Sequence, residues 1–374
     1  MNALGKTAIV TGANGFIGAY LVNALLKRGW IVHALGRSKG NISWRQRVVT
    51  AATEAAPAGV VPDFSGLFCH EADFARPDLG LSSSKLFSRA ESAALVHLAG
   101  DTRFVPPDPA MQRRTNVDAT LNVVRALRPV ISRMIHVSTA YVAGDRTGII
   151  LETDTDCGQG FHNHYEKTKF EAEVAVRALC ADLVVPLAIA RPSIIVNDTV
   201  HGRSSVFTHL NVLVEVANRI QEYYGIGDGE VVNREIRVPM NPVARPNTAP
   251  VDPVAEALAL IVESPAAAGK NFHLCHPAPQ TNAEVFDLVM SAFGIKGEID
   301  LRFVTELPKP LTRTEEMVAR AFRVYLPYLN QTTTFDCANT CALIPNYDRM
   351  FPAMMVEYLR KVIAFERASR KLGV

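Results

Sequence analysis

Tyr165 and Lys169 are the residues of this chain whose types and spacing best suit acid-base chemistry. They stand four positions apart, so on a helix both side chains would point from the same face. A phenol with a solution pKa of about 10 is a poor proton donor or acceptor at neutral pH, and a lysine one turn away supplies the missing help. The spacing predicts proton transfer at Tyr165, although an apolar ring beside a solvated cation would give the same pattern.

A strand that ends in hydroxyl groups precedes this pair. Residues 135–144 read IHVSTAYVAG, an apolar run that leads into Ser138 and Thr139. Ligands of parallel α/β sheets bind at the carboxyl ends of the strands, so we expect these hydroxyl groups at the substrate site. In combination with such a strand end, Tyr165 and Lys169 indicate a catalytic site and not a chance arrangement.

A glycine-rich segment near the N-terminus has the context of a dinucleotide-binding motif. Residues 12–18 read GANGFIG; they follow an apolar strand and open an amphipathic helix. Such a motif makes a tight turn, brings backbone N–H groups close to a pyrophosphate and allows contact between helix and strand, and glycine permits each step. Without that context, the same letters would indicate only a glycine-rich turn. The residues expected to contact the cofactor here are Gly12, Asn14, Gly15, Phe16, Ile17 and Gly18.

The end of the second expected strand indicates which cofactor binds. About 20 residues beyond the glycines, an acidic residue would bind the ribose 2′-hydroxyl of NADH, whereas an arginine would accept the 2′-phosphate of NADPH. Residues 31–40 contain no Asp or Glu but include Arg37 and Lys39. We therefore expect NADPH; the alternative is that both cations are simply solvated at the surface.

The elements that must position these residues alternate along the first half of the chain. Short apolar runs alternate with amphipathic stretches, which is the pattern of a parallel sheet with helices on both faces. We predict a Rossmann-type, doubly wound α/β fold of six or more strands. The expected strands are 7–11, 31–35, 66–69, 94–98, 134–138 and 187–190, and the expected helices are 16–28, 111–127 and 165–181.

The regular alternation of expected strands and helices ends after Pro192, and the remainder is expected to be mostly helical. Residues 238–250 are rich in Pro and Asn and are expected to form a loop at the boundary. We predict two parts, a dinucleotide-binding domain over 1–200, to which 250–265 return, and a smaller substrate-binding lobe over 201–249 and 266–374. In that lobe an apolar surface suits an acyl chain, and core packing would explain it equally well. Its residues are Val318, Ala321, Phe322, Tyr325, Leu326 and Leu329.

Composition narrows the class of protein. The 374 residues suffice for two domains or for one with an added lobe, and 39 Lys and Arg against 37 Asp and Glu leave a charge of +2, too small a field for nucleic-acid binding. No apolar run reaches the roughly 18 residues that a membrane span needs. The six cysteines are scattered and no signal peptide is evident, which favours a cytoplasmic protein. We expect a monomer or a homodimer, a choice that the sequence leaves open.

Two pairs of residues have types that could ligate a metal, but neither pair suffices for a metal site. Cys337 and Cys341 have helical spacing, but a structural zinc needs four ligands and no third or fourth is near in the sequence. His162 and His164 precede the expected catalytic helix and are explained by hydrogen bonding or solvation. We therefore expect no metal.

Taken together, these motifs resemble the extended short-chain dehydrogenase/reductase superfamily. The resemblance rests on the glycine motif, on HLAG at 97–100, on the hydroxyl strand end and on Tyr165 with Lys169, which together span most of 7–195. Residues 72–82 (ADFARPDLGLS) and 165–173 (YEKTKFEAE) are similar to the thioester-reductase and fatty acyl-CoA reductase branch. LPYL at 326–329 matches the C-terminal region of the acyl-CoA reductases more loosely.

This resemblance implies roles by position. Thr139 would be the hydroxyl partner of Tyr165, Lys169 would hold the cofactor ribose, and Asn116 would support the catalytic helix or its proton relay. Asp73 would approach the adenine. Alternatively, Asp73 is only a turn residue and Asn116 only bonds to the backbone of its own helix, and neither would then serve the site. The further cofactor contacts implied are Phe74, Leu98, Ala99, Gly100, Pro192, Ser193 and Ile194.

The function implied is NADPH-dependent reduction of an acyl thioester to an aldehyde, with further reduction to the alcohol as an option. The acyl group would come from acyl-CoA or from an acyl or peptidyl carrier protein, because no carrier or adenylation segment is evident in the chain. One alternative is oxidation or reduction of a free alcohol or carbonyl, such as a steroid, a flavonoid or a nucleotide sugar. A cofactor-binding protein without turnover is disfavoured, because a sensor would not need Tyr165, Lys169 and Thr139 together.

Overall fold

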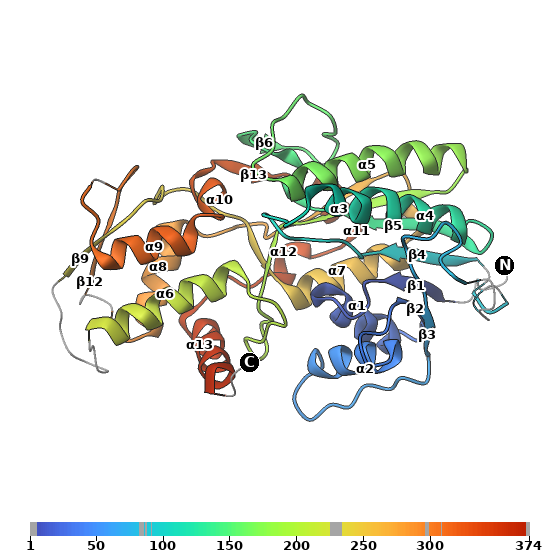
Figure 1. Cartoon of the computed structure of the whole chain (residues 1–374), viewed down its shortest axis with the longest axis horizontal. Coiled ribbons are helices and arrows are strands. Elements are labelled where there is room, and N and C mark those ends of the chain that lie inside the picture. The colour runs from blue at the N-terminus through green and yellow to red at the C-terminus, as the bar shows by residue number, and fades with distance from the viewer. Residues whose placement is uncertain are drawn as a thin grey trace.

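The computed structural model describes most of the chain. The described residues are 6–81, 86, 88–90, 92–224, 234–295, 299–307 and 309–371. Ser82, which closes one of the segments on which the family resemblance rests, lies outside them. The chain folds into an α/β part and a smaller, mostly helical lobe, which lie beside each other along the long axis of the molecule (Figure 1).

Seven parallel strands form the central sheet. The chain order reverses between β1 and β4, and this reversal creates the switch point at which ligands bind in such sheets. The predicted Rossmann-type, doubly wound fold is therefore confirmed. In spatial order the strands are β3 (Leu67–Glu71), β2 (Ile31–Gly36), β1 (Thr7–Thr11), β4 (Ala93–His97), β5 (Ile131–Val137), β7 (Leu187–Pro192) and β11 (Asn271–Leu274).

Helices cover both faces of this sheet. One face carries α1 (Phe16–Lys27), α2 (Trp44–Glu54) and α7 (Val251–Glu263), and the other carries α4 (Ala119–Leu127) and α5 (His164–Asp182). Strand β1 shows the alternation, because Ala8 and Val10 join the core under α1 and α7 whereas Ile9 joins the core under α4 and α5. All five β1 residues are buried, as expected for a strand covered on both sides.

The single helix predicted over 111–127 is divided into three pieces. A short helix α3 (Pro109–Arg113) leads into one π-helical turn (Arg114–Asp118), and α4 follows. Asp108 caps α3 by accepting a hydrogen bond of 3.0 Å from the backbone of Met111. The π turn widens the helix at Asn116 and places that side chain toward α5, an irregularity that hydrophobic periodicity does not report.

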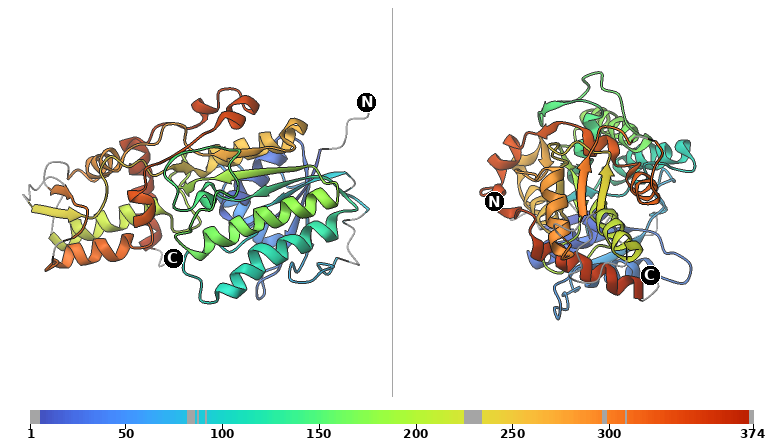
Figure 2. Two further views of the ribbon diagram at one scale, coloured as in Figure 1. Left: turned by 90° about the horizontal axis from the view of Figure 1, so that it is seen from above. Right: turned by 90° about the vertical axis from the view of Figure 1, so that its left-hand side faces the viewer.

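The lobe has a core of its own. Strands β9 and β12 pair in parallel and lie between helices, as the view onto the lobe in Figure 2 (right) shows. Val318, Phe322 and Leu329 are buried in this core, so packing accounts for them and they offer no free surface to an acyl chain. The lobe elements are α6 (His209–Tyr224), β9 (Arg234–Val238), α8 (Asn282–Ala292), β12 (Ile299–Phe303), α9 (Arg313–Phe322), α10 (Leu326–Asn330) and α13 (Val356–Lys371).

The chain returns from the lobe to the α/β part several times. Residues 238–250 are not all loop, because β10 (Thr248–Pro250) pairs with β8 (Ile194–Val196). Strand β11 belongs to the central sheet, although it lies within 266–374, the segment that the sequence assigned to the lobe. The two-part division stays a prediction, and the two parts alternate along the chain more often than the sequence indicated. The other returning elements are β13 (Thr333–Phe335), which pairs with β6 (Gly148–Ile150), and the helices α11 (Ala338–Leu343) and α12 (Tyr347–Met350).

Among the described residues, the structure has no helix whose length and apolar character would let it span a bilayer.

Candidate active site

Helix α5 presents Tyr165 and Lys169 on one face at the carboxyl edge of the sheet. Asn163 caps the helix by accepting a hydrogen bond of 3.0 Å from the backbone of Glu166, so Tyr165 stands in the first turn and Lys169 in the second. Burial raises the pKa of Tyr165 to about 12, and hydrogen bonding with Thr139 opposes this rise. The phenol is therefore protonated at neutral pH and placed beside the predicted hydroxyl partner.

Lys169 is buried beneath the site. Its Nζ donates a hydrogen bond of 2.8 Å to the carbonyl oxygen of Val137 at the end of β5. Burial lowers the pKa of Lys169 to about 8, and the charge of Glu173 one turn further on acts against this. The predicted hold of Lys169 on the cofactor ribose, and its help to the phenol, stay predictions.

Glu173 joins the catalytic helix to strand β7. Its carboxylate accepts two hydrogen bonds, of 2.7 and 3.0 Å, from the guanidinium of Arg191. Both side chains are buried, with exposures of 3% and 2%, and Arg177 contributes a second ion pair at 3.6 Å. Burial alone would raise the pKa of Glu173, but the charge and hydrogen bonds of Arg191, together with Ser138 and Arg177, outweigh it and the pKa lies below its ordinary value. Arg191 thus points into the protein core and not toward the cofactor.

Thr139 occupies the end of β5. Its Oγ1 donates a hydrogen bond of 3.3 Å to the carbonyl oxygen of Pro192 and caps the short 3-10 helix Ala140–Ala143 through the backbone of Tyr141. Pro192 ends β7, and Ser193 and Ile194 continue from it into β8. The structure thereby brings the predicted substrate-side and nicotinamide-side residues to one edge of the sheet.

The glycine-rich segment forms a cradle that side chains would block. Gly12 has a φ of +69°, and a Cβ there would lie 2.9 Å from the backbone nitrogen of Ala99. At Gly18 a Cβ would lie 2.1 Å from the carbonyl oxygen of Gly12. Helix α1 starts after Gly15 without a side-chain cap, which leaves its first N–H groups available to a pyrophosphate. The cradle therefore fits a dinucleotide.

The other predicted cradle residues lie around this loop. Asn14, Phe16 and Ile17 are half-buried at the start of α1, and Ile17 packs against the core beneath the helix. Leu98 and Ala99 follow β4 and are bound to β1, since the backbone of Ala99 donates a hydrogen bond of 3.2 Å to Thr11 Oγ1. Sequence reasoning placed all of these residues in one site, and the fold brings them together.

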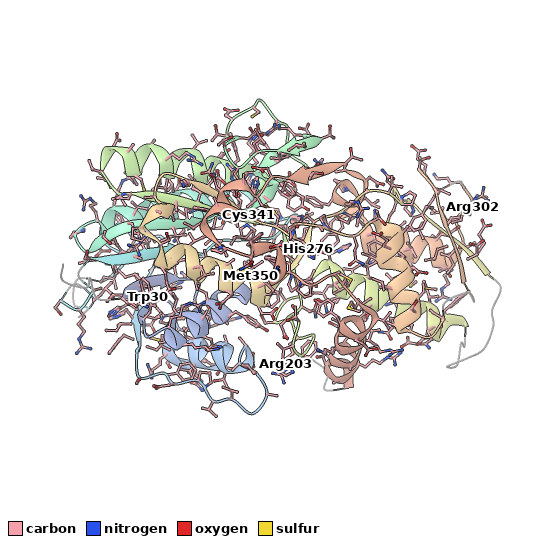
Figure 3. All side chains as sticks on the ribbon, turned by 180° about the vertical axis from the view of Figure 1, so that it is seen from behind. Trp30, Arg203, His276, Arg302, Cys341 and Met350 are labelled. Carbon is pink, nitrogen blue, oxygen red and sulfur yellow. The ribbon has the colours of Figure 1, made fainter. Side chains whose placement is uncertain are left out.

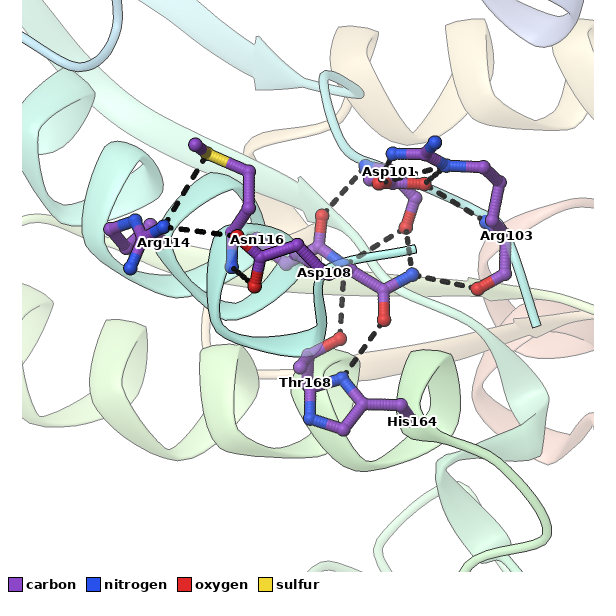
Figure 4. A network of polar contacts seen from close by, with 9 residues as sticks. Asp101, Arg103, Asp108, Arg114, Asn116, His164 and Thr168 are labelled. Carbon is purple, nitrogen blue, oxygen red and sulfur yellow. Dashed lines mark hydrogen bonds and ion pairs between the residues drawn. The ribbon is translucent and has the colours of Figure 1, made fainter. Parts of the chain in front are cut away.

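Asn116 connects the loop after β4 with the catalytic helix (Figure 4). Its Oδ1 accepts a hydrogen bond of 2.7 Å from the backbone of Asp101, and its Nδ2 donates one of 2.9 Å to Thr168 Oγ1. A Cβ at Gly100 would lie 3.1 Å from the same Oδ1. Asn116 is thus bonded across to α5 and not only to its own helix, which agrees with its predicted support of that helix.

The region expected to bind the 2′-phosphate carries charges of both signs. Arg37 is exposed and pairs with Asp73 at 3.4 Å, and the backbone of Ser38 donates a hydrogen bond of 3.0 Å to Glu71. The sequence around Arg37 is free of acids, but the end of β3 brings these two carboxylates beside it. Sequence reasoning missed Glu71, although its place at the end of the neighbouring strand could have indicated it. Lys39 is exposed, and Phe74 packs partly buried beneath α4.

An aromatic wall, made of Phe104, Tyr141, Tyr325 and Tyr328, connects the lobe with Tyr165. The Phe104 ring lies 6.0 Å from the Tyr165 ring and 5.8 Å from the Tyr325 ring, centre to centre. Tyr141 and Tyr328 meet edge to face at 4.7 Å. These contacts join segments that are far apart in the chain, so of the wall only Tyr325 was indicated by the sequence, as part of the apolar surface expected for an acyl chain.

A buried carboxylate anchors this wall to the catalytic helix. Tyr328 donates a hydrogen bond to Glu166, the residue after Tyr165, and receives one of 2.6 Å from Asn163. Glu166 also accepts a hydrogen bond of 2.8 Å from the backbone of His162. Burial raises the pKa of Glu166 above its ordinary value. Sequence reasoning singled out the segment that holds Tyr328 for its family resemblance and for its leucines, and gave Tyr328 itself no contact here.

The described residues include no group of three or more His, Cys, Asp or Glu side chains arranged to hold a metal ion. The arrangement at the sheet edge instead offers a dinucleotide cradle next to two hydroxyl groups and a buried lysine.

This fold and this site define an NAD(P)-dependent oxidoreductase of the extended short-chain dehydrogenase/reductase superfamily. Within that superfamily the chain belongs to the family described as Male sterility protein, whose model matches residues 10–258. The predicted membership of the thioester-reductase and fatty acyl-CoA reductase branch is confirmed.

Comparisons with curated proteins find relatives among fungal biosynthetic enzymes. The chain is 24% identical over 382 residues to nonribosomal peptide synthetase asaC of Aspergillus flavus, an alignment that covers 94% of this chain and 35% of asaC. It is 27% identical over 176 residues to the NAD-dependent epimerase/dehydratase terH of Aspergillus terreus, covering 45% of this chain and 47% of terH. The chain thus spans half or less of the length of these relatives.

Solved structures share the fold over the whole chain. The terminal R domain from the myxalamid PKS-NRPS biosynthetic pathway superposes with a TM-score of 0.76 at 20% identity, covering 100% of this chain and 92% of that one. A UDP-glucuronic acid 4-epimerase from Bacillus cereus in complex with NAD gives a TM-score of 0.66 at 15% identity, covering 98% of both chains. At these identities the likeness establishes the fold.

Replacing Tyr165 by Phe tests the proton donor. Tyr165→Phe keeps the ring that packs on Phe104 and removes the hydroxyl, so we expect turnover to fall by roughly 10² or more. Cofactor affinity should stay within about twofold, because the cradle is untouched. Steady-state kinetics and a fluorescence titration with NADPH measure the two quantities. A variant that retained most of its activity would make Tyr165 a bystander.

The lowered pKa of Lys169 predicts a pH-dependent stability. Between pH 8 and about 10.5 the unfolded chain holds a proton at Lys169 that the folded chain has released, so the free energy of unfolding rises with pH. Relative to Lys169→Met, the native protein should gain about 2 kcal/mol from pH 8 to pH 10. Urea unfolding at both pH values measures this gain. Lys167→Met, an exposed change on the same helix, is the control and should follow the native protein; equal slopes for all three would refute the shift.

Proposed function

We propose that this protein reduces acyl thioesters to aldehydes with NADPH and releases the free thiol. The observation that supports this most strongly is the agreement over the full length of the chain. The match to a synthetase covers 94% of it, and the superposition on a terminal R domain covers all of it. The hydrogen bonding between Thr139 and Tyr165, with Lys169 one turn further along α5 and bonded to the end of β5, supports assigning these three residues to carbonyl reduction.

The residues of the chain divide the reaction between them. Bound in the glycine cradle, NADPH supplies a hydride to the thioester carbon. The hydroxyl groups of Thr139 and Tyr165 hydrogen-bond the carbonyl oxygen and stabilise the negative charge that develops on it. Tyr165 is protonated at neutral pH and gives its proton to this oxygen, while Lys169 beneath it favours the transient phenolate.

Loss of the thiol completes the first reduction. When the tetrahedral adduct collapses, its hydroxyl proton returns to the Tyr165 phenolate, the C=O bond of the aldehyde forms and the C–S bond breaks. The thiolate departs and takes up a proton from solvent. The balance is one thioester, one NADPH and one proton giving one aldehyde, one thiol and one NADP⁺. A ketone or sugar lacks a leaving group and would stop at the alcohol.

The acyl donor is proposed to be a carrier-protein thioester, with acyl-CoA as the alternative. Two relatives are named as synthetases, the nonribosomal peptide synthetase asaC and the peramine synthetase ppzA of Metarhizium majus. A solved thiolation-reductase di-domain from an archaeal non-ribosomal peptide synthetase has a TM-score of 0.75 at 16% identity. Residues other than Thr139, Tyr165 and Lys169, the catalytic trio, would then bind the carrier protein. A cytoplasmic location and a monomeric or homodimeric state complete the proposal, and the six free cysteines fit a reducing compartment.

A second candidate is oxidoreduction of a free carbonyl, alcohol or nucleotide sugar. It is favoured by the likeness to terH and to the UDP-glucuronic acid 4-epimerase, whose fold is shared over 98% of this chain. The catalytic trio would serve that chemistry as well, so the substrate decides between the two candidates.

The proposed preference for NADPH rests on the cationic side chains that follow β2. The Arg37 side chain is exposed, and Arg47 donates a hydrogen bond to the carbonyl oxygen of Arg37, so a second guanidinium lies beside the Arg37 backbone. Glu71 is already engaged by the backbone and hydroxyl of Ser38. The 2′-phosphate would then be received by Arg37 and Lys39 in place of the exposed ion pair with Asp73.

Arg37→Asp tests this preference. The change removes a charge-assisted contact to the phosphate and adds a repulsive carboxylate, so NADPH should bind about 30-fold more weakly, or about 2 kcal/mol. NADH, which lacks the phosphate, should bind with little change. Titration of both cofactors gives the comparison, with Arg76→Ala as an exposed arginine control. Equal affinity of the native protein for NADH and NADPH would contradict the proposal.

Thiol release tests the thioester substrate. NADPH absorbance and thiol formation, reported by a chromogenic disulfide, are followed in one sample with acyl-pantetheine substrates. One thiol should form for each first hydride transferred, because the leaving group departs only after reduction. A sample without NADPH subtracts the reaction of the exposed Cys157 and Cys341. NADPH consumption with free ketones or sugars, and none with any thioester, would favour the second candidate.

A further inference from the structure

Both chain neighbours of Tyr165 are tied to segments that are remote from α5 in the sequence. His164 Nδ1 forms a hydrogen bond of 3.0 Å with Gln112 Oε1 (Figure 4). Gln112 Nε2 in turn donates hydrogen bonds of 2.7 and 3.3 Å to carbonyl oxygens of the loop after β4. On the other side of Tyr165, Glu166 accepts a hydrogen bond from Tyr328 of the lobe. The first turn of α5 is therefore held from two directions.

The carboxylate of Glu166 is fully enclosed by protein. Its exposure is 0%, and that of Tyr328 is 3%. The Tyr328 hydroxyl receives a hydrogen bond of 2.6 Å from Asn163, the residue that caps α5, and donates its own proton to Glu166. A buried carboxylate that loses such a donor is left without compensation for its lost hydration. The hydroxyl of a lobe residue is thus part of the structure that fixes the start of the catalytic helix.

The Tyr328 ring also packs against the ring that lies next to Tyr165. Its centre is 5.5 Å from that of Phe104 and 4.7 Å from that of Tyr141. Phe104 in turn lies 6.0 Å from the Tyr165 ring. The contacts therefore form a closed circuit, from Tyr165 along the chain to Glu166, then to Tyr328, to Phe104 and back to Tyr165. Within such a circuit, no side chain can shift without moving the others.

The place of the phenol determines how fast it can act. A misplacement of about 1 Å at a reacting group can lower a rate by about 10²-fold. Tyr165 stands in the first turn of α5, where the backbone N–H groups have no partner within the helix. The position of this turn therefore depends on contacts from outside the helix, and the circuit through Tyr328 supplies them.

We propose that Glu166 and Tyr328 are a positioning pair: through one hydroxyl group, the lobe fixes the first turn of α5 and sets the place of the Tyr165 phenol. The inference rests on the proposed reduction and adds to it a residue of the lobe on which the rate depends. Tyr328 acts through Tyr165 and is not itself a catalytic residue.

Tyr328→Phe tests the pair, because it removes the hydroxyl and keeps the ring between Tyr141 and Phe104. With octanoyl-pantetheine, kcat should fall about tenfold, while KM and the Kd of NADPH should stay within about twofold. With NADPH deuterated at the transferred hydrogen, the isotope effect on kcat should increase, because a misplaced phenol slows the hydride step itself. A loss of stability alone would change neither the ratio of kcat to KM nor the isotope effect.

Tyr347→Phe is the matched control. Tyr347 is 1% exposed, and its hydroxyl donates a hydrogen bond of 2.8 Å to the carbonyl oxygen of Cys275. It begins α12, whose last residue, Met350, is labelled in Figure 3. The same atom is thus deleted from a buried tyrosine that does not belong to the circuit. This variant should lose stability and keep its kcat and its isotope effect.

Two changes at Glu166 give an independent measurement if Tyr328→Phe fails to fold, as judged by its thermal transition. Glu166→Gln keeps the length of the side chain and an acceptor for the hydroxyl, so it should retain most of kcat. Glu166→Met has a similar length and no acceptor of comparable strength, so its kcat should fall about tenfold. Equal kcat values for these two variants would overturn the pair.

The outcomes for the pair and for the proposed function are distinct. A normal kcat in Tyr328→Phe, a change confined to KM, or an equal loss of kcat in Tyr347→Phe would overturn the pair alone. Absence of turnover with every thioester, together with activity on a free carbonyl, would instead overturn the proposed function. The same variants compared on that carbonyl would then decide about the pair, because Tyr165 serves both reactions.

Discussion

The buried ion pair between Glu173 and Arg191 determines how the two halves of the reaction site are held together. It joins the third turn of the catalytic helix to the strand whose end supplies Pro192. Removing one partner of such a pair costs about 3–5 kcal/mol, because the other charge stays buried without compensation. Replacing both by apolar residues would be far less costly, so the pair serves geometry more than stability. It also keeps a negative charge one turn from Lys169, which opposes the loss of the lysine proton.

The site achieves polarity without many free charges. His97 illustrates this: burial lowers its pKa to about 3, and the neutral ring bridges Thr11 and Thr120 with hydrogen bonds of 2.8 and 2.9 Å. Tyr165 is likewise uncharged at neutral pH. Lys169 differs from these groups, because its pKa of about 8 lies close to neutral pH. A low-dielectric surrounding of this kind strengthens the few hydrogen bonds directed at a substrate carbonyl.

Local sequence carried most of the information about the cofactor side, because its residues are consecutive and their physical demands are specific. The turn at Gly12 and the approach at Gly18 permit no side chain, so type and spacing alone identified them. The lobe side could not be read in this way. Tyr328 meets Glu166 across 162 positions of sequence, and neither residue has a local pattern that indicates the contact. Glu71 was missed for the same reason: it becomes a neighbour of Ser38 only when β3 pairs with β2.

The interleaving of the two parts constrains how the molecule is made. Two strand pairs join segments that are far apart in the sequence. Strand β7 ends at Pro192 and its partner β11 begins at Asn271, whereas β6 ends at Ile150 and its partner β13 begins at Thr333. A ribosome must therefore deliver α6 and β9 before β11 can pair with β7, and α8, β12, α9 and α10 as well before β13 can pair with β6. The loop-closure entropy of these distant contacts slows their formation. Until then the edge of β7 stays open to pairing with other chains, a period in which chaperones would protect the nascent protein.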